Sequence, residues 1–192
     1  MKRFITSLML LCMGLSAMAQ EALIPENYME TDPALAYQYE QNILNCSEWL
    51  INTPLTPEMQ YPRMAVSQFV MMWMQVSPSI QINFDTTLME FLDDLTSEDL
   101  QTNMATVYCA SYMAGLIREK AAEGKINTST VVPKGTTNAD KVTGAMSAIE
   151  GCIRFYDNNK EQIGRIRTLE KYKKMQKEGT LRDYVEGNLG TR

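Results

Sequence analysis

The feature that most constrains the fold is the recurrence of apolar residues at three- and four-residue intervals along most of the chain. The clearest such stripe follows Asn138, a residue type that caps helix N-termini. Side chains at these intervals share one face of an α-helix, so the segment predicts an amphipathic helix packed on a core. The members of the stripe are Val142, Ala145, Met146, Ile149, Cys152, Ile153 and Tyr156.

The same spacing predicts further helices, separated by breaks rich in proline, glycine and asparagine. Asp32 and Pro33 are suited to open the first of them, as N-cap and first helical residue. The helix expected at 62–76 is apolar on nearly every face, which is typical of a central, buried helix. The expected helices are 33–52, 62–76, a short one after Thr86, 96–124, 138–156, a basic one at 160–178 and a short last one after Gly179.

One stretch departs from helical spacing. Ile80, Ile82 and Phe84 alternate with polar residues, which predicts an extended segment. The sequence offers it no clear partner strand, so we expect a connector lying on the helices. The predicted fold class is all-α: a compact bundle of six or seven helices with one short extended segment near residues 79–85.

The N-terminus has the pattern of a secretory signal. Lys2 and Arg3 precede an apolar run, and Ala17 and Ala19 supply the small residues before a cleavage point. The run is shorter than the about 20 residues that cross a bilayer, and no later stretch has the pattern of a transmembrane segment. We therefore expect a periplasmic or secreted protein with a cleavable signal peptide at 1–19, an irregular segment at 20–32 and a single helical domain at 33–192.

The chain contains no histidine. This excludes Ser–His–Asp and Cys–His catalytic groups, zinc sites built on histidines, and haem held by a proximal histidine. No glycine-rich nucleotide loop and no CxxC pair is present. The sequence therefore assigns no catalytic residue, no cofactor and no metal ligand, and it favours a non-enzymatic protein. A hydrolase that uses Asp and Glu alone stays an alternative, because any two carboxylates can meet in a fold.

The net charge is −5, and removal of Lys2 and Arg3 with the signal would make it −7. An acidic chain of this kind disfavours nucleic acid as a partner, because binding it needs a basic face. The basic residues gather after residue 150. We expect the basic C-terminal helices to lie on an acidic body, in preference to forming a docking surface for anionic lipid or polymer.

Sulfur-containing residues are frequent. Cys46, Cys109 and Cys152 each lie in an apolar helical stripe, which favours small buried side chains, although one disulfide between two of them stays open. Met71 and Met72 belong to a cluster of the soft ligands that Cu(I) prefers, but neighbouring positions on a helix point in different directions. Core filling is the favoured interpretation. The acidic run 93–99 lacks the ligand pattern of a calcium loop and indicates a helix start.

Arg63 stands out because it is the only Lys or Arg between Arg3 and Arg118. It lies in the first turn of an apolar helix, where the helix dipole disfavours a cation. We therefore expect a structural ion pair with Glu48 or Glu58, with ligand binding as the alternative. Trp49 and Trp73 are the other candidate contacts for a ligand or partner.

Several segments resemble a pattern found in small exported helical proteins of Bacteroidetes. The first is Cys-Ser-Glu-Trp-Leu-Ile-Asn-Thr-Pro-Leu at 46–55, and the others are Arg63, Phe69, Trp73, Ser77-Pro78 and the tail at 179–185. The resemblance implies an all-α fold and a location in the cell envelope. It carries over no site residues.

These observations favour an exported, non-enzymatic helical protein that acts by protein–protein interaction in the periplasm, of the immunity, inhibitor or envelope-accessory type. The alternative is a carrier that binds a small apolar ligand between helices, near Trp49, Trp73 and the methionines. The third and weaker alternative is the hydrolase based on carboxylates alone.

Overall fold

The computed structural model describes residues 23–190, so the predicted signal peptide at 1–19 lies outside the described part. Within that part the regular secondary structure is helical and there is no strand, which confirms the predicted all-α bundle. The α-helices are α2 (Glu40–Asn52), α3 (Gln60–Val76), α4 (Glu98–Ala122), α5 (Asn138–Asn158), α6 (Lys160–Ile163), α7 (Arg167–Glu178) and α8 (Leu181–Gly190). Between residues 23 and 190 the 3-10 helices are η1 (Tyr28–Glu30), η2 (Pro33–Tyr39), η3 (Pro57–Met59) and η4 (Thr86–Leu92).

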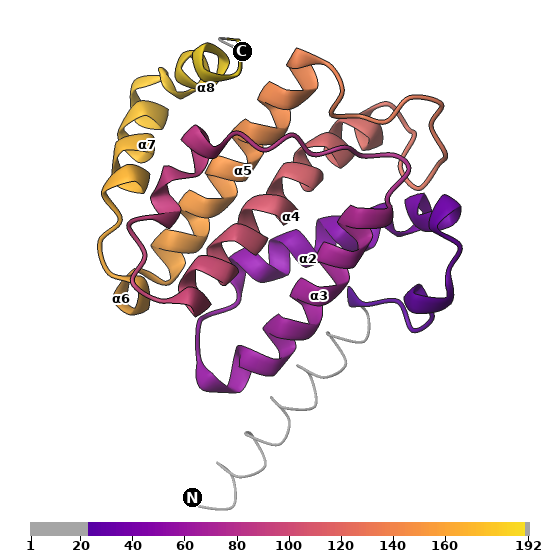
Figure 1. Ribbon diagram of the computed structural model, residues 1–192, viewed down its shortest axis with the longest axis horizontal. Helices are drawn as coiled ribbons and strands as arrows, with labels where there is room; N and C mark the ends of the chain where they lie inside the picture. Colours follow the sequence, from indigo (N-terminus) through magenta and orange to yellow (C-terminus); the bar gives the residue numbers. More distant parts are fainter. Residues whose placement is uncertain (1–22, 191–192) are drawn as a thin grey trace, which may run out of the picture.

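The pair α4 and α5 forms the centre of the bundle (Figure 1). Helices α2 and α3 pack on one side of this pair, while α8 packs on α5 and α7 contacts both α5 and η4. Every residue from 106 to 117 of α4 is buried. None of the helices in the described range is long and apolar enough to cross a membrane.

The expectation that residues 62–76 form the central helix is wrong. In α3 the buried residues make a single stripe, and Met64 is 61 % exposed. The central helix α4 instead contains five Ala, two Thr, two Tyr, one Ser and one Gly, residues that hydropathy patterns count as weakly apolar or polar. Small side chains allow helices to approach closely, so burial here follows from backbone proximity, which hydrophobicity alone does not reveal.

Close approach is most evident at Gly151 of α5. A Cβ atom placed there would lie 2.0 Å from Ser111 Oγ and 2.6 Å from Ser111 Cβ on α4. No real Cβ tolerates such distances, so the α4–α5 spacing requires glycine at this position.

Several helix boundaries differ from the prediction. The predicted helix 33–52 is a 3-10 helix followed by α2, although Asp32 does cap it by accepting from Ala34 N–H. The predicted basic helix 160–178 is divided into α6 and α7 because Gly164 has a φ of 78°, a conformation that breaks a right-handed helix. Helix α5 is capped by Thr137, which forms a capping box with Asp140, and the predicted cap Asn138 is its first residue.

The predicted extended segment near residues 79–85 has a partner in the structure. Ile80 forms an isolated parallel bridge with Lys134, in the loop before α5. Gln81 N–H donates to Lys134 O at 2.7 Å, and Lys134 N–H donates to Ser79 O at 2.9 Å. Ile80 is buried while Phe84 is 51 % exposed, so the segment is a connector between α3 and η4 and does not cover the core.

Candidate functional site

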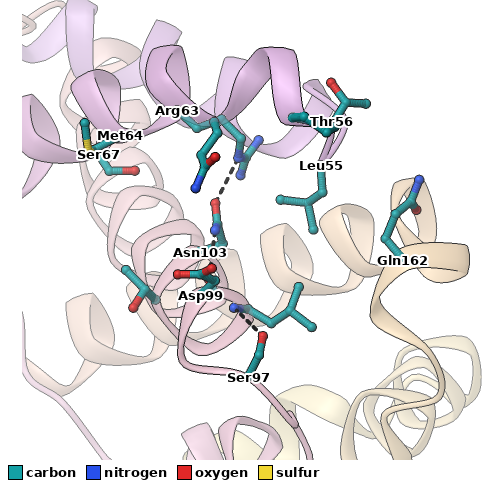
Figure 2. Close-up of a pocket in the computed structure, with 13 residues that line it drawn as sticks. Leu55, Thr56, Arg63, Met64, Ser67, Ser97, Asp99, Asn103 and Gln162 are labelled. Atoms are coloured by element: carbon teal, nitrogen blue, oxygen red, sulfur yellow. Dashed lines mark hydrogen bonds between the residues drawn. The ribbon is translucent and has the colours of Figure 1, made fainter.

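A cleft with a volume of about 610 Å³ lies between the start of α3 and the start of α4. Figure 2 shows its wall, to which the α2–α3 connection, α3, α4 and α6 contribute. The lining residues are Leu55, Thr56, Pro57, Gln60, Arg63, Met64, Ser67, Ser97, Asp99, Leu100, Thr102, Asn103 and Gln162.

A second hollow of about 570 Å³ continues along the same two helices. It shares Met64, Ser67 and Thr102 with the cleft, so the two hollows adjoin, and together they are here called the α3–α4 groove. The second hollow is otherwise lined by Gln68, Met71, Ala105 and Thr106.

Local structure fixes the two walls of the groove. On one side, the connection after α2 is held by the buried Asn159, whose Oδ1 accepts from Leu55 N–H at 2.8 Å. On the other side, Ser97 caps α4 by accepting from Leu100 N–H at 3.2 Å. The walls therefore belong to elements that the bundle holds in place.

Arg63 is the central charged residue of the cleft wall, and it is only 3 % exposed. Its Nη1 donates to Leu50 O at 3.0 Å and to Thr53 O at 2.8 Å, two carbonyls at the end of α2. Its Nε donates to Asn103 Oδ1 at 2.9 Å. The partial negative charge at a helix C-terminus favours a cation, which explains why the guanidinium of Arg63 can be buried at the end of α2.

The predicted ion pair of Arg63 with Glu48 or Glu58 is wrong, because no ion pair of the described residues includes Arg63. Glu48 pairs instead with Arg118 and Arg154, each at 2.8 Å. The sequence could not show this choice, since α5 brings Arg154 beside Glu48 only in the folded bundle.

The guanidinium of Arg63 is incompletely satisfied. Its Nη2 is buried and has no hydrogen-bond partner among the described residues. The ring of Phe155 lies 5.0 Å from Cζ, which provides a cation–π contact but no acceptor. Burial lowers the pKa of Arg63 to about 10, so the group stays a cation at neutral pH.

Methionines shape the outer part of the groove. Met64 is exposed and Met71 half-buried, and both line it, whereas Met72 Sδ accepts from Tyr28 O–H at 4.0 Å. The clustered methionines are therefore divided between two surroundings, and flexible thioether side chains of this kind suit an adaptable contact surface.

The two tryptophans lie elsewhere. Trp73 is 2 % exposed and its Nε1–H donates to Ala36 O at 2.7 Å. Trp49 is half-buried against the core. Of the three candidate contact residues, the structure places only Arg63 in the groove. Met64 belongs to the methionines that the sequence offered for an apolar ligand, whereas sequence reasoning missed Asn103 and Ser67, because only the packing of α3 on α4 brings them together.

Carboxylates do not face each other across the groove. Asp99 is the one acidic residue in its lining. Glu48 and Glu150 line a separate hollow of about 60 Å³, where the hydrogen bond from Arg154 lowers the pKa of Glu48. A carboxylate held ionised by two arginines is a poor general acid. No group of three or more acidic or cysteine side chains in the described range has the geometry to hold a metal ion.

The groove and its buried guanidinium are thus the features from which a function can be argued, and the resemblance to exported Bacteroidetes proteins stays a prediction. Comparison with protein-family models, curated proteins and solved structures finds no match to this chain.

Proposed function

We propose that this chain is a non-enzymatic protein of the cell envelope that acts by binding another protein, and that the α3–α4 groove receives a segment of that partner. The observation that carries the proposal is that two hollows adjoin along one helix pair and share Met64, Ser67 and Thr102 in their lining. A groove between helices suits a helical or extended peptide, whose side chains enter at regular intervals.

Exposed residues on the first turns of α3 support the same function. Met64, which lines both hollows of the groove, is 61 % exposed, and Tyr61 on the same helix is 76 % exposed. Tyrosine and methionine are enriched in protein interfaces because they bury large, adaptable surfaces. The alternative of a carrier is less well supported, because Trp49 and Trp73 line neither hollow of the groove and the groove opens along its length.

Site-specific photo-crosslinking tests the proposal. A benzophenone amino acid replaces Met64 or Met71 in the source cells, which are then illuminated and analysed by immunoblot and mass spectrometry. We expect both positions to yield the same cross-linked protein. Matched control positions are Val131, which is fully exposed in the loop before α5, and Lys177, which is exposed on α7. Cross-links that arise equally from the control positions, or from neither groove position, would refute the proposal.

A further inference from the structure

The donors of Arg63 define what the groove can accept. A guanidinium has five N–H donors in a planar fork. Three of them reach Asn103 Oδ1, Leu50 O and Thr53 O. Both N–H groups of Nη2 remain without an acceptor among the described residues, and the side chain is otherwise held rigidly by its three hydrogen bonds. The guanidinium is therefore held in one orientation, and within the described range the buried Nη2 is its one nitrogen with vacant N–H groups.

The surroundings supply no counter-charge to this edge. Asp99 lines the cleft but is exposed on the first turn of α4, and it forms no ion pair with Arg63 among the described contacts. Figure 2 shows the guanidinium on the side of the cleft that faces Leu55 and Thr56. A buried cation without a counter-charge is costly, and a carboxylate would supply that charge while accepting a hydrogen bond from Nη2.

The rest of the cleft limits the class of carboxylate. Its apolar lining residues are Leu55, Pro57, Met64 and Leu100. Hydroxyl and amide groups of Ser67, Thr56 and Gln60 lie among them. An occupant that fits this lining carries one acidic group with apolar neighbours. Because the net charge of the chain is −5, the protein as a whole does not attract anions, and the attraction has to come from Arg63 itself.

We infer that the Arg63 end of the α3–α4 groove binds a carboxylate carried by an otherwise apolar peptide segment of the partner. This inference rests on the proposed function and adds the chemistry of the bound segment: an Asp or Glu side chain, or a chain terminus, that pairs with Nη2 of Arg63 while apolar neighbours contact Met64 and Leu55.

Selection from a random 12-residue peptide library displayed on phage, against the protein from residue 20 onward, tests the inference. Peptides that bind the wild-type protein and lose binding to Met64→Glu occupy the groove. We expect these peptides to share an acidic residue flanked by apolar ones. In a synthetic version of such a peptide, Glu→Gln should weaken binding to the wild-type protein about tenfold or more, measured by calorimetry.

Variants of the protein provide the reciprocal test. Arg63→Met should abolish the difference between the Glu and Gln peptides, and Arg63→Lys should retain part of it, because lysine keeps the charge without the fork. Lys177→Met, which removes an exposed cation on α7, should leave the difference unchanged. Circular dichroism verifies folding, and the peptide exchange on wild-type protein does not depend on any variant.

The outcomes separate this inference from the proposed function. Groove-binding peptides without an acidic preference would overturn the inference and leave the proposed function intact. Peptides insensitive to Met64→Glu would contradict both. A third experiment adds hexanoate or hexanamide to the protein and follows binding by NMR of the methionine methyl groups. Saturable binding of hexanoate below about 1 mM, with no groove-binding peptide, would overturn the peptide as the source of the carboxylate.

Discussion

Lys120 Nζ donates a hydrogen bond to Glu40 Oε1 in the interior of the bundle, where the two side chains are 1 % and 0 % exposed. The same oxygen accepts from Ser79 Oγ at 2.6 Å, and Glu40 Oε2 accepts from Asn127 N–H at 2.7 Å. Lys120 also donates to Thr128 O at 3.1 Å. One ion pair thus joins α2, α4, the extended segment and the loop before α5.

Glu40→Gln should destabilise the protein strongly, because it leaves the ammonium of Lys120 buried without a counter-charge. The expected loss is about 3–5 kcal/mol, the range found when one partner of a buried pair is removed. Urea unfolding measures it. The double variant Glu40→Gln/Lys120→Met should recover part of the loss. The control Glu123→Gln, which removes ion pairs with Lys125 and Lys134 at the surface, should leave the unfolding midpoint nearly unchanged. Equal effects of the two single substitutions would contradict this account.

Gly151→Ala should destabilise the bundle by about 1–3 kcal/mol, because its new methyl group would collide with Ser111. The intrinsic helix preference for alanine, about 1 kcal/mol, only partly offsets this cost. Thermal unfolding followed by circular dichroism compares it with Gly187→Ala on α8, where a Cβ meets nothing within 4 Å. That control should be neutral or stabilising, and a stabilised Gly151→Ala protein would show that α4 and α5 are not closely packed.

The three described cysteines should resist thiol reagents. Cys46, Cys109 and Cys152 are free and buried, and burial raises the pKa of Cys46 to about 12 and that of Cys109 to about 11. The reactive thiolate is then almost absent at neutral pH. Reaction with a disulfide reagent should be slow in the native protein and rapid in denaturant, with all three thiols titrating. A native disulfide would appear as two missing thiols.

Glu48 should contribute a modest pH dependence to stability. Its hydrogen bond from Arg154, with the charge of Arg118, lowers its pKa below the usual 4.5 in the folded state. A depressed pKa stabilises the fold above the unfolded value and loses this effect as pH falls through the folded value. Because the side chain is 42 % exposed, the contribution should stay below about 1 kcal/mol. Urea midpoints from pH 6 to about pH 3 should fall less for Glu48→Gln than for wild type. An equal fall of the urea midpoint in the two proteins would contradict this expectation.

Some features of this protein depend only on residues that are neighbours in the sequence, and others depend on how the helices pack together. The amphipathic stripe beginning at Val142 appears in the structure as the buried face of α5, and the Asp32 cap forms as expected. Helical periodicity and capping are properties of adjacent residues, so the sequence carries them directly. Gly164 also could have been recognised as a break, because it is the one glycine inside the basic segment 160–178.

The candidate site could be predicted only in part. Arg63 was identifiable by its isolation in the sequence, but its contacts with Leu50, Thr53 and Asn103 were not. Those partners lie 10 to 40 positions away, on other elements. An ion pair with the nearest acids was the expectation from charge alone, whereas in the bundle the end of α2 supplies backbone carbonyls.

The sequence by itself determined the helical class of this protein, the approximate extent of its helices and the absence of histidine chemistry, because these depend on residue type and local spacing. Only the tertiary structure decided that α4 is central, that Glu40 meets Lys120 and that Arg63 keeps an unpaired nitrogen beside a groove. The physical reason is that burial and pairing depend on the distances between elements. Small residues such as Gly151 set those distances, and hydrophobic periodicity does not record them.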